Sequence, residues 1–383
     1  MHADQRLGRR SIADRIVRLA AEGRAGQPLL FSGPAGSGKE ITALGIARRL
    51  NCRAPDSCTA DSPCESCAKA ITFQHPDIRW IGPAPASFDD AAHSAKVREV
   101  FAAKQANPFA DTGLGGTSQI IIGNPEQPGP LSVRGLLQFL RRQSFQGAWK
   151  VAIVADAHRL NVAAANAFLK TLEEPPPDSL IILLTSRPSS LLSTVRSRCQ
   201  KVPFEPYPDD RVDDIVAALK PEVAAETRAE VVRLSAGDAR RAFALLQPEL
   251  RAVQDWAASV FLELHEGRTT AGHLAAECLN AGVLPVAIEG DEAGTEGGKS
   301  GKGAKSGKGG KSKKGARSTD ATQRRRRALA FCEALVVLTA ETLACREQGA
   351  AWRPRLASRA AQVRALAPRR RARGLLADLA RIE

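Results

Sequence analysis

The chain has 383 residues with 43% hydrophobic but only 4% aromatic side chains, which predicts two or three domains with cores built mainly of Ala, Leu and Val. Its formal net charge is +14, but residues 299–327 alone hold twelve Lys or Arg and one Asp, so the excess belongs to one segment and a uniformly basic fold is excluded. No apolar run approaches the roughly 20 residues of a membrane span, and the charged N-terminus lacks an apolar signal region, which predicts a cytoplasmic protein with no membrane partner.

Three apolar segments in the first half of the chain are typical of buried strands. The first, in "QPLLFSGPAGSGKE", leads into a glycine-rich turn and a helix from about residue 41. The second, within 150–158, ends in a carboxylate, and the third is 180–186. Between them, Asn161 can cap an Ala-rich helix that Pro175–Pro177 must end. Strands that alternate with helices predict a parallel, doubly wound α/β sheet, whose ligands bind beyond the carboxyl ends of the strands.

The stretch "GPAGSGKE" matches a phosphate-binding loop, G-x-x-x-x-G-K followed by Ser or Thr, except at its last position. Glu40 stands where a small hydroxyl side chain would bind Mg²⁺, which indicates a degenerate nucleotide site. A chance glycine-rich turn is the alternative interpretation. The candidate nucleotide-binding residues of the loop are Gly33, Gly36, Gly38, Lys39 and Glu40.

The second predicted strand also lacks a residue that hydrolysis needs. ATPases of this architecture usually end that strand with two adjacent acids, one for Mg²⁺ and one for the attacking water. Here Asp156 is followed by Ala157. Because two catalytic groups are missing from one centre, we expect a retained nucleotide fold that binds ATP or ADP weakly and does not hydrolyse it.

Four cysteines lie close together in the sequence, with the spacing C-x5-C-x5-C-x2-C. In a cytoplasmic chain, where thiols stay reduced, such a cluster predicts a structural, tetrahedral Zn²⁺; four unpaired thiols in a loop are the alternative. The remaining cysteines, Cys199, Cys278, Cys332 and Cys345, are scattered and are expected to be packing residues. The candidate ligands are Cys52, Cys58, Cys64 and Cys67.

From about residue 209 onward the sequence shows only helical patterns. Residues 209–246 suggest a small helical domain, and 251–288 with 322–383 suggest a second one. Between the last two lies a Gly, Lys and Ser-rich tract that cannot bury apolar surface and is predicted to be a disordered loop.

Several stretches, taken in order, resemble the clamp-loader subunits of bacterial DNA polymerase III, and among them the delta prime family over roughly residues 10–250. The resemblance implies an AAA+ P-loop domain over 1–206 with a zinc-binding insertion at 52–67, a helical lid over 207–250, and an all-α collar over 251–383 that the tract at about 290–322 interrupts. The matching stretches are "LLFSGPAGSGK", the cysteine loop, "HPDI", "KVAIVADAHRLNVAAANAFLKTLEEPP", "LLTSRPSSLLSTVRSRCQ" and "LSAGDARRAF".

The resemblance also implies roles for single residues. Arg198, in "SRC", would reach a neighbouring subunit's ATP site as an arginine finger. Thr185 and Ser186 match the position that senses the γ-phosphate in active members, and Arg240 matches the lid arginine that contacts nucleotide. In a subunit that does not hydrolyse ATP, these last three positions are either functional or relics.

One departure from the family pattern concerns the metal ligands. The usual zinc spacing is C-x8-C-x2-C-x2-C, and here Asp61 occupies its second position. We expect Cys58, three residues earlier, to replace it, because thiolate suits Zn²⁺ better; Asp61 is the alternative.

The expected function is therefore that of a non-hydrolysing subunit in a five-membered ring with delta and tau/gamma subunits. The complex would load the sliding clamp on primed DNA, as part of the polymerase holoenzyme. One alternative is an active tau/gamma-type ATPase. Another is a zinc-containing nucleic-acid-binding protein with a vestigial P-loop fold, supported by the Lys-rich tract.

Overall fold

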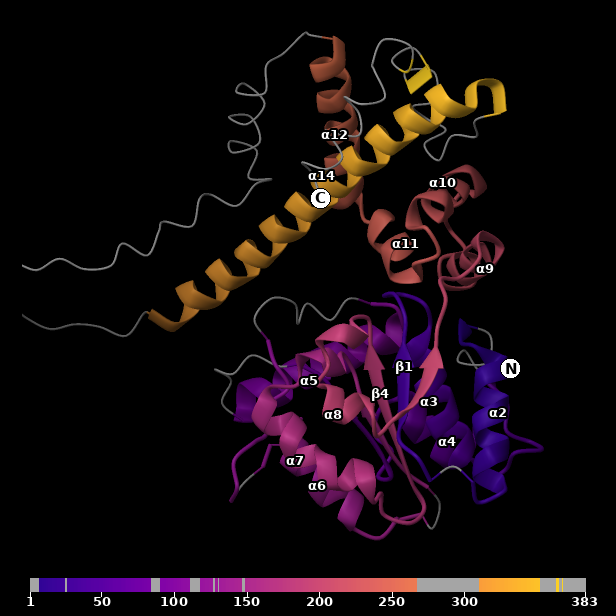
Figure 1. Ribbon diagram of the computed structural model, residues 1–383, viewed down its shortest axis with the longest axis vertical. Coiled ribbons are helices and arrows are strands. Elements are labelled where there is room, and N and C mark those ends of the chain that lie inside the picture. Colours follow the sequence, from indigo (N-terminus) through magenta and orange to yellow (C-terminus); the bar gives the residue numbers. More distant parts are fainter. Residues whose placement is uncertain are drawn as a thin grey trace, which may run out of the picture. The chain divides into compact units, whose positions relative to one another are not determined.

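The structure of the chain is a computed structural model (Figure 1). It describes residues 7–24, 26–83, 90–110, 118–126, 128–129, 131–146, 149–266, 310–351, 363–364 and 367. The chain forms two compact units, Met1–Phe243 and Ala244–Glu383.

The first unit is built on a five-stranded parallel sheet with the strand order β2-β3-β4-β1-β5. The order places β1 between β4 and β5, with Leu30 opposite Leu183, although β1 comes first in the chain. The three predicted strands are confirmed as β1, β3 and β4, whereas β2 and β5 were not predicted. The strands are β1 (Leu29–Ser32), β2 (Ile78–Ile81), β3 (Lys150–Val154), β4 (Ser179–Thr185) and β5 (Gln200–Pro203).

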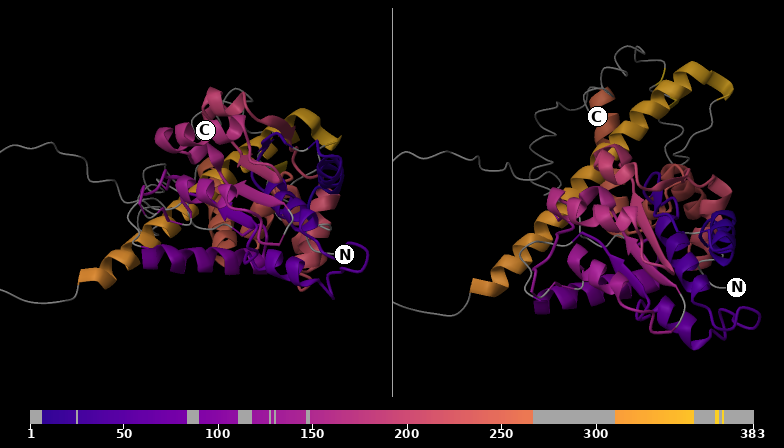
Figure 2. Two further views of the ribbon diagram at one scale, coloured as in Figure 1. Left: turned by 90° about the horizontal axis from the view of Figure 1, so that it is seen from below. Right: turned by 60° about the horizontal axis from the view of Figure 1, so that its bottom comes forward.

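Helices cover both faces of this sheet, and successive strand residues alternate between two cores (Figures 1 and 2). Leu30 packs with α6, α7 and α8 on one face, while Leu29 and Phe31 pack with α2, α3 and α5 on the other. The first group is α6 (Val133–Arg141), α7 (Val162–Glu173) and α8 (Ser193–Arg196); the second is α2 (Arg10–Ala21), α3 (Lys39–Leu50) and α5 (Asp90–Ala106), with α4 (Glu65–Ile71) beside α3.

The predicted cap and the predicted end of the helix after β3 are both confirmed. Asn161 Oδ1 accepts the N–H of Ala164 at 2.8 Å, and α7 ends just before Pro175–Pro177. The P-loop leads directly into α3, as the strand–loop–helix pattern predicts.

Three short helices end the first unit, and the last of them continues past its boundary at Phe243: α9 (Asp209–Leu219), α10 (Ala225–Ser235) and α11 (Ala239–Leu245). They follow β5 directly. The start of α11 packs on the glycine-rich loop, since Ala239 N donates to the carbonyl of Gly36 at 3.3 Å.

The second unit contains α12 (Pro248–Glu266) and α14 (Gly310–Gln348), which pack along each other. Trp256 and Phe331 meet with ring centroids 4.9 Å apart, and Leu338 packs against Phe261. The predicted parallel α/β sheet is confirmed, and the domain built on it is followed by three short helices and an all-α segment.

The structure differs from the sequence prediction within the Gly and Lys-rich tract. Residues 290–309 lie outside the described residues, but 310–322 belong to α14, where a disordered loop was expected. Extending a helix that is already anchored by packing costs far less than starting one, and the Lys, Ala and Arg residues of this part favour the helix. Within the described residues, none of the helices has the length and apolarity needed to cross a bilayer.

Candidate functional site

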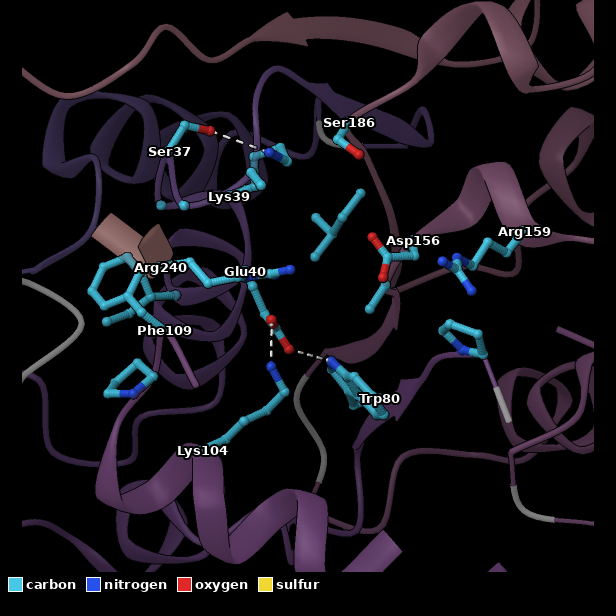
Figure 3. Close-up of a pocket in the computed structure, with 18 residues that line it drawn as sticks. Ser37, Lys39, Glu40, Trp80, Lys104, Phe109, Asp156, Arg159, Ser186 and Arg240 are labelled. Atoms are coloured by element: carbon cyan, nitrogen blue, oxygen red, sulfur yellow. Dashed lines mark hydrogen bonds and ion pairs between the residues drawn. The ribbon is translucent and has the colours of Figure 1, made fainter. Parts of the chain in front are cut away.

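A cavity lies at the carboxyl edge of the sheet, and the glycine-rich loop forms one of its walls (Figure 3). The strand ends, α5 and the start of α11 form the others. Its polar and charged lining residues outside the loop come from distant parts of the sequence: Trp80, Lys104, Asp156, Arg159, Ser186 and Arg240.

The loop takes a shape that only glycine permits at two positions. Gly36 and Gly38 have φ of +62° and +86°. A Cβ atom would lie 1.7 Å from Asp238 Oδ1 at Gly36, and 1.8 Å from the Tyr207 hydroxyl at Gly38. Gly33 begins the loop, and its N–H donates to the carbonyl of Thr185 at 3.2 Å. The loop is therefore fixed between the sheet and the segment around α11.

Lys39 is folded back onto its own loop. Its Nζ donates to Ser37 Oγ at 3.2 Å (Figure 3) and to the carbonyl of Gly33 at 2.8 Å, and it also contacts the carbonyl of Pro34. Burial and the nearby Arg240 guanidinium lower the pKa of Lys39 to about 8, although neighbouring carboxylates oppose this shift. The site thus holds two cations near each other, an arrangement that an anion would stabilise.

Both carboxylate oxygens of Glu40 are bonded. Trp80 Nε1 donates to Oε1 at 2.7 Å, and Lys104 Nζ contacts Oε2 at 2.6 Å (Figure 3). The side chains of Lys104 and Glu40 are only 4% and 17% exposed. Glu40 is therefore a neutralised, anchored part of the wall.

The ends of β3 and β4 place the other predicted residues. Asp156 follows β3 with φ of +48° and lines the cavity, while Ala157 is fully buried where a second acid would stand. Of the predicted sensor pair, Ser186 lines the cavity, but Thr185 is buried beside it. Its Oγ1 lies 3.2 Å from His158 Nδ1 and accepts the N–H of Arg187.

Arg240 lies in the first turn of α11 and completes the cavity. Its Nε is buried and has no hydrogen-bond partner among the described residues. With Lys39, Lys104 and Arg159, four basic side chains line the cavity against two acidic ones, so its chemistry favours an anion. Trp80, Lys104 and Arg159 were not predicted from the sequence, which contains no local signal for them.

Arg198 does not line this cavity. It follows α8, and its Nε donates to Glu173 Oε1 at 2.6 Å, while Nη1 donates to the carbonyl of Thr194 at 2.8 Å. Its side chain is 33% exposed. The predicted arginine finger is therefore a surface residue, distinct from the P-loop site of its own chain.

The four clustered cysteines converge in space. Their Sγ atoms all lie within 4.8 Å of one another, and those of Cys52 and Cys64 are 3.9 Å apart. Four thiolates around one Zn²⁺ with Zn–S of about 2.3 Å would be about 3.8 Å apart, so the cluster has the size of a metal site. Asp61 is exposed and is not part of the cluster.

The thiol pKa values within this cluster move in both directions: burial raises the pKa of Cys52 and of Cys67, whereas the pKa of Cys64 is lowered. Burial alone would raise the pKa of Cys64, but the backbone N–H groups of Cys67 and Arg53 point at its sulfur and lower the pKa to about 6. Arg48 Nη1 also donates to Cys67 Sγ at 3.4 Å. Elsewhere, Cys199 and Cys345 are buried packing residues, as predicted; Cys332 is half-buried, and Cys278 lies outside the described residues.

Comparison with known proteins identifies a family. The family described as "DNA polymerase III, delta subunit" matches residues 8–208. DNA polymerase III subunit delta' of Pseudomonas aeruginosa is 30% identical over 210 residues, which cover 54% of this chain and 52% of the relative. The Escherichia coli subunit delta' is 29% identical and covers 61% and 58%. Subunit tau of Bacillus subtilis is 26% identical and covers 63% and 36%.

The chain spans about half the length of the curated delta' relatives it matches. Among solved structures, a gamma subunit-related protein of DNA polymerase III from Thermotoga maritima aligns over 96% of each chain at 17% identity, with a TM-score of 0.38. That likeness is too distant to bear on function.

Proposed function

The chain belongs to the DNA polymerase III delta subunit family, and from this membership we propose that it acts as a delta prime type subunit of a clamp-loader complex. Its partners would be delta and tau/gamma subunits in a five-membered ring, and through the ring the sliding clamp and primed DNA. A cytoplasmic location goes with this role.

The non-hydrolysing role is supported by the residues at two positions, Glu40 and Ala157. The position of the metal-binding hydroxyl holds a carboxylate whose two oxygens are bonded to Trp80 and Lys104. The position of the water-activating acid holds a buried methyl group. In a working P-loop these two positions supply the Mg²⁺ ligand and the general base, so this chain's own site supports binding at most.

Arg198 would act on a neighbour. A guanidinium at the surface can stabilise charge on a phosphoryl group held by another chain, because that role needs neither a metal ligand nor a base in its own chain. Its separation from the cavity of its own chain supports this assignment.

Zn²⁺ would hold the loop between α3 and α4. The Sγ spacing fits a metal bound by four thiolates, and no open coordination position is implied. The residues that would hold it are Cys52, Cys58, Cys64 and Cys67. Zn²⁺ would supply local folding energy to this loop and no catalysis.

Reconstitution tests the proposal. The purified chain is mixed with the tau/gamma and delta subunits of the same organism and passed through a sizing column, and ATP turnover is measured for the isolated chain and for the complex. We expect co-elution in one complex, turnover by the complex stimulated by clamp and primed DNA, and background turnover by the isolated chain. Elution apart from the other subunits would contradict the clamp-loader role. Turnover by the isolated chain that Lys39→Ala abolishes would instead favour an active ATPase.

A zinc-containing nucleic-acid-binding protein remains the second candidate, favoured by the twelve Lys or Arg in 299–327. Salt-sensitive binding to DNA by the isolated chain, without assembly, would support it.

A further inference from the structure

The wall of the cavity carries an ion pair at the position where a P-loop normally binds a metal ion. Glu40 is the residue that follows the loop lysine, and Lys104 Nζ lies 2.6 Å from its Oε2. Trp80, at β2, fixes the other oxygen at 2.7 Å. The ammonium is thus held by a carboxylate that is itself anchored to the sheet (Figure 3).

The residues present do not fit Mg²⁺. This ion requires oxygen ligands at about 2.0–2.1 Å in nearly octahedral geometry. Both oxygens of Glu40 already accept hydrogen bonds from nitrogen donors, and Lys104 would repel a divalent cation brought to the same carboxylate. Asp156 is left as a lone acid, because Ala157 follows it.

The same residues do fit a phosphate group. Lys39 and Arg240 line the cavity beside Lys104, and Arg240 Nε is buried without a hydrogen-bond partner among the described residues. The first turn of α3, a twelve-residue helix, presents backbone N–H groups behind the loop. An anion placed there would neutralise cations that now oppose one another.

We propose that this cavity binds the phosphate groups of a nucleotide without Mg²⁺, through Lys39 and Arg240, and that the ion pair of Glu40 with Lys104 fills the position where a working P-loop binds the metal. The inference rests on the proposed function, in which the chain keeps a nucleotide-binding fold, and it specifies that the nucleotide binds without a metal ion. Such a site takes a metal-free nucleoside diphosphate or triphosphate and cannot hydrolyse it.

Calorimetric titration of the wild-type chain with ADP tests the proposal without any substitution. One titration contains excess MgCl₂ and the other excess EDTA. We expect binding in both, with dissociation constants that agree within about twofold. Affinity that rises tenfold or more with Mg²⁺, or no binding of ADP at millimolar concentration, overturns the proposal.

Variants then assign the effect to Lys104. Lys104→Met keeps the aliphatic stem and leaves the Glu40 carboxylate without its cation beside the bound phosphates, so affinity for ADP should fall by about tenfold or more. Lys220→Met is the matched control, because it removes the same charge from the exposed ion pair with Glu222 and should leave affinity unchanged. Equal effects of the two substitutions, in variants with wild-type melting curves, would refute the role of Lys104.

The double variant Glu40→Thr, Lys104→Met should convert the cavity into a P-loop site that can bind Mg²⁺. It restores a hydroxyl after Lys39 and removes the competing ammonium, with Asp156 still in place. ADP binding by this variant should tighten when Mg²⁺ is added, and binding that stays indifferent to Mg²⁺ counts against the proposal. Assembly with partner subunits is a separate readout: a chain that co-elutes with them but binds no ADP refutes this inference alone.

Discussion

The guanidinium of Arg198, just after α8, and the carboxylate of Glu173, the last residue of α7, form an ion pair with Nε 2.6 Å from Oε1. The carbonyl of Thr194 holds a second nitrogen of the same group at 2.8 Å. These contacts orient the side chain at the surface before any partner binds. Because the pair is partly exposed, it contributes at most about 1 kcal/mol to the free energy of unfolding.

Arg198→Ala should therefore leave the fold and the assembly of the ring nearly unchanged and lower ATP turnover by the assembled complex. Removing an arginine finger supplied in trans can cost on the order of a thousandfold at the affected site, although other sites in the ring limit the total loss. Clamp- and DNA-stimulated turnover of reconstituted complexes is the measurement.

Two further variants separate position from charge. Arg198→Lys keeps the charge but loses the planar fork, so it should behave like Arg198→Ala. Glu173→Gln keeps a hydrogen-bond acceptor for Arg198 and should retain most of the turnover. Wild-type turnover in the Arg198→Ala complex would leave this chain a purely architectural subunit.

One Zn²⁺ per chain is expected by elemental analysis, held by four thiolates. Cys64→Ser should release it and loosen the segment between α3 and α4, because binding at such sites is coupled to local folding. Hydrogen exchange over residues 52–67 would report the loosening. Cys332→Ser, which alters a half-buried thiol outside the cluster, is the control.

The ligand set is tested by a pair of substitutions. Cys58→Ser should reduce zinc content and affinity, and Asp61→Ala should change neither, since Cys58 lies within the cluster and Asp61 is exposed outside it. The reverse result would make the family spacing, with Asp61, the true ligand set.

Nucleotide affinity should depend on pH through Lys39. The pKa of Lys39 is lowered to about 8 by burial and by Arg240, whereas an anion bound beside it favours the protonated form. Affinity for ADP should thus be nearly constant below pH 7 and fall above pH 8, by up to tenfold per pH unit for one proton. Titrations from pH 7 to 9 measure this. Lys39→Arg, which stays charged, should remove the dependence if it preserves binding.

Long, locally determined features of the first unit could be predicted from the sequence. The strands β1, β3 and β4 are continuous apolar runs, and the cap at Asn161 is a short-range signal. By contrast, β2 is four residues that include Arg79, and β5 has mostly exposed residues, Gln200 and Lys201 among them. Neither shows the apolar run or clean alternation on which strand prediction depends.

The site could be predicted only in part, for a similar reason. The P-loop and the cysteine cluster are short motifs whose residues are close in sequence. Lys104 lies 64 residues from its partner Glu40, in a helix without any motif, and only tertiary folding brings them together. The structure also separates Ser186 from Thr185, two neighbours that the sequence alone leaves equivalent.

A buried hydrogen-bond chain beside the cysteine cluster gives a prediction for stability. His75 Nδ1 accepts the N–H of Asp77 at 3.0 Å, so Nε2 carries the proton and lies 2.9 Å from Ser66 Oγ, which in turn donates to the carbonyl of Asn51. Burial lowers the pKa of His75, against the opposing effect of the Asp77 carboxylate and with minor help from Lys69 and Arg53. The neutral ring is thus the form that the fold requires.

Because the unfolded chain holds a proton on His75 more readily than the folded chain, stability should rise with pH across this window. The contribution of His75 to the free energy of unfolding is complete above the pKa of about 6.5 that its imidazole has in the unfolded chain. It is lost as pH falls toward the lower pKa of the folded chain, and the free energy of unfolding changes by at most about 1.4 kcal/mol per pH unit. Urea unfolding of the wild type and of His75→Gln between pH 7.5 and 5.5 measures it. The difference in the free energy of unfolding between the two proteins should shrink as pH falls. Asp77 adds little to the slope in this range. Burial raises its pKa, but the N–H groups of Phe145 and Gln146 and the Lys150 ammonium outweigh that effect and lower the pKa below 3.8. A difference that stays constant with pH would show that His75 does not titrate on unfolding.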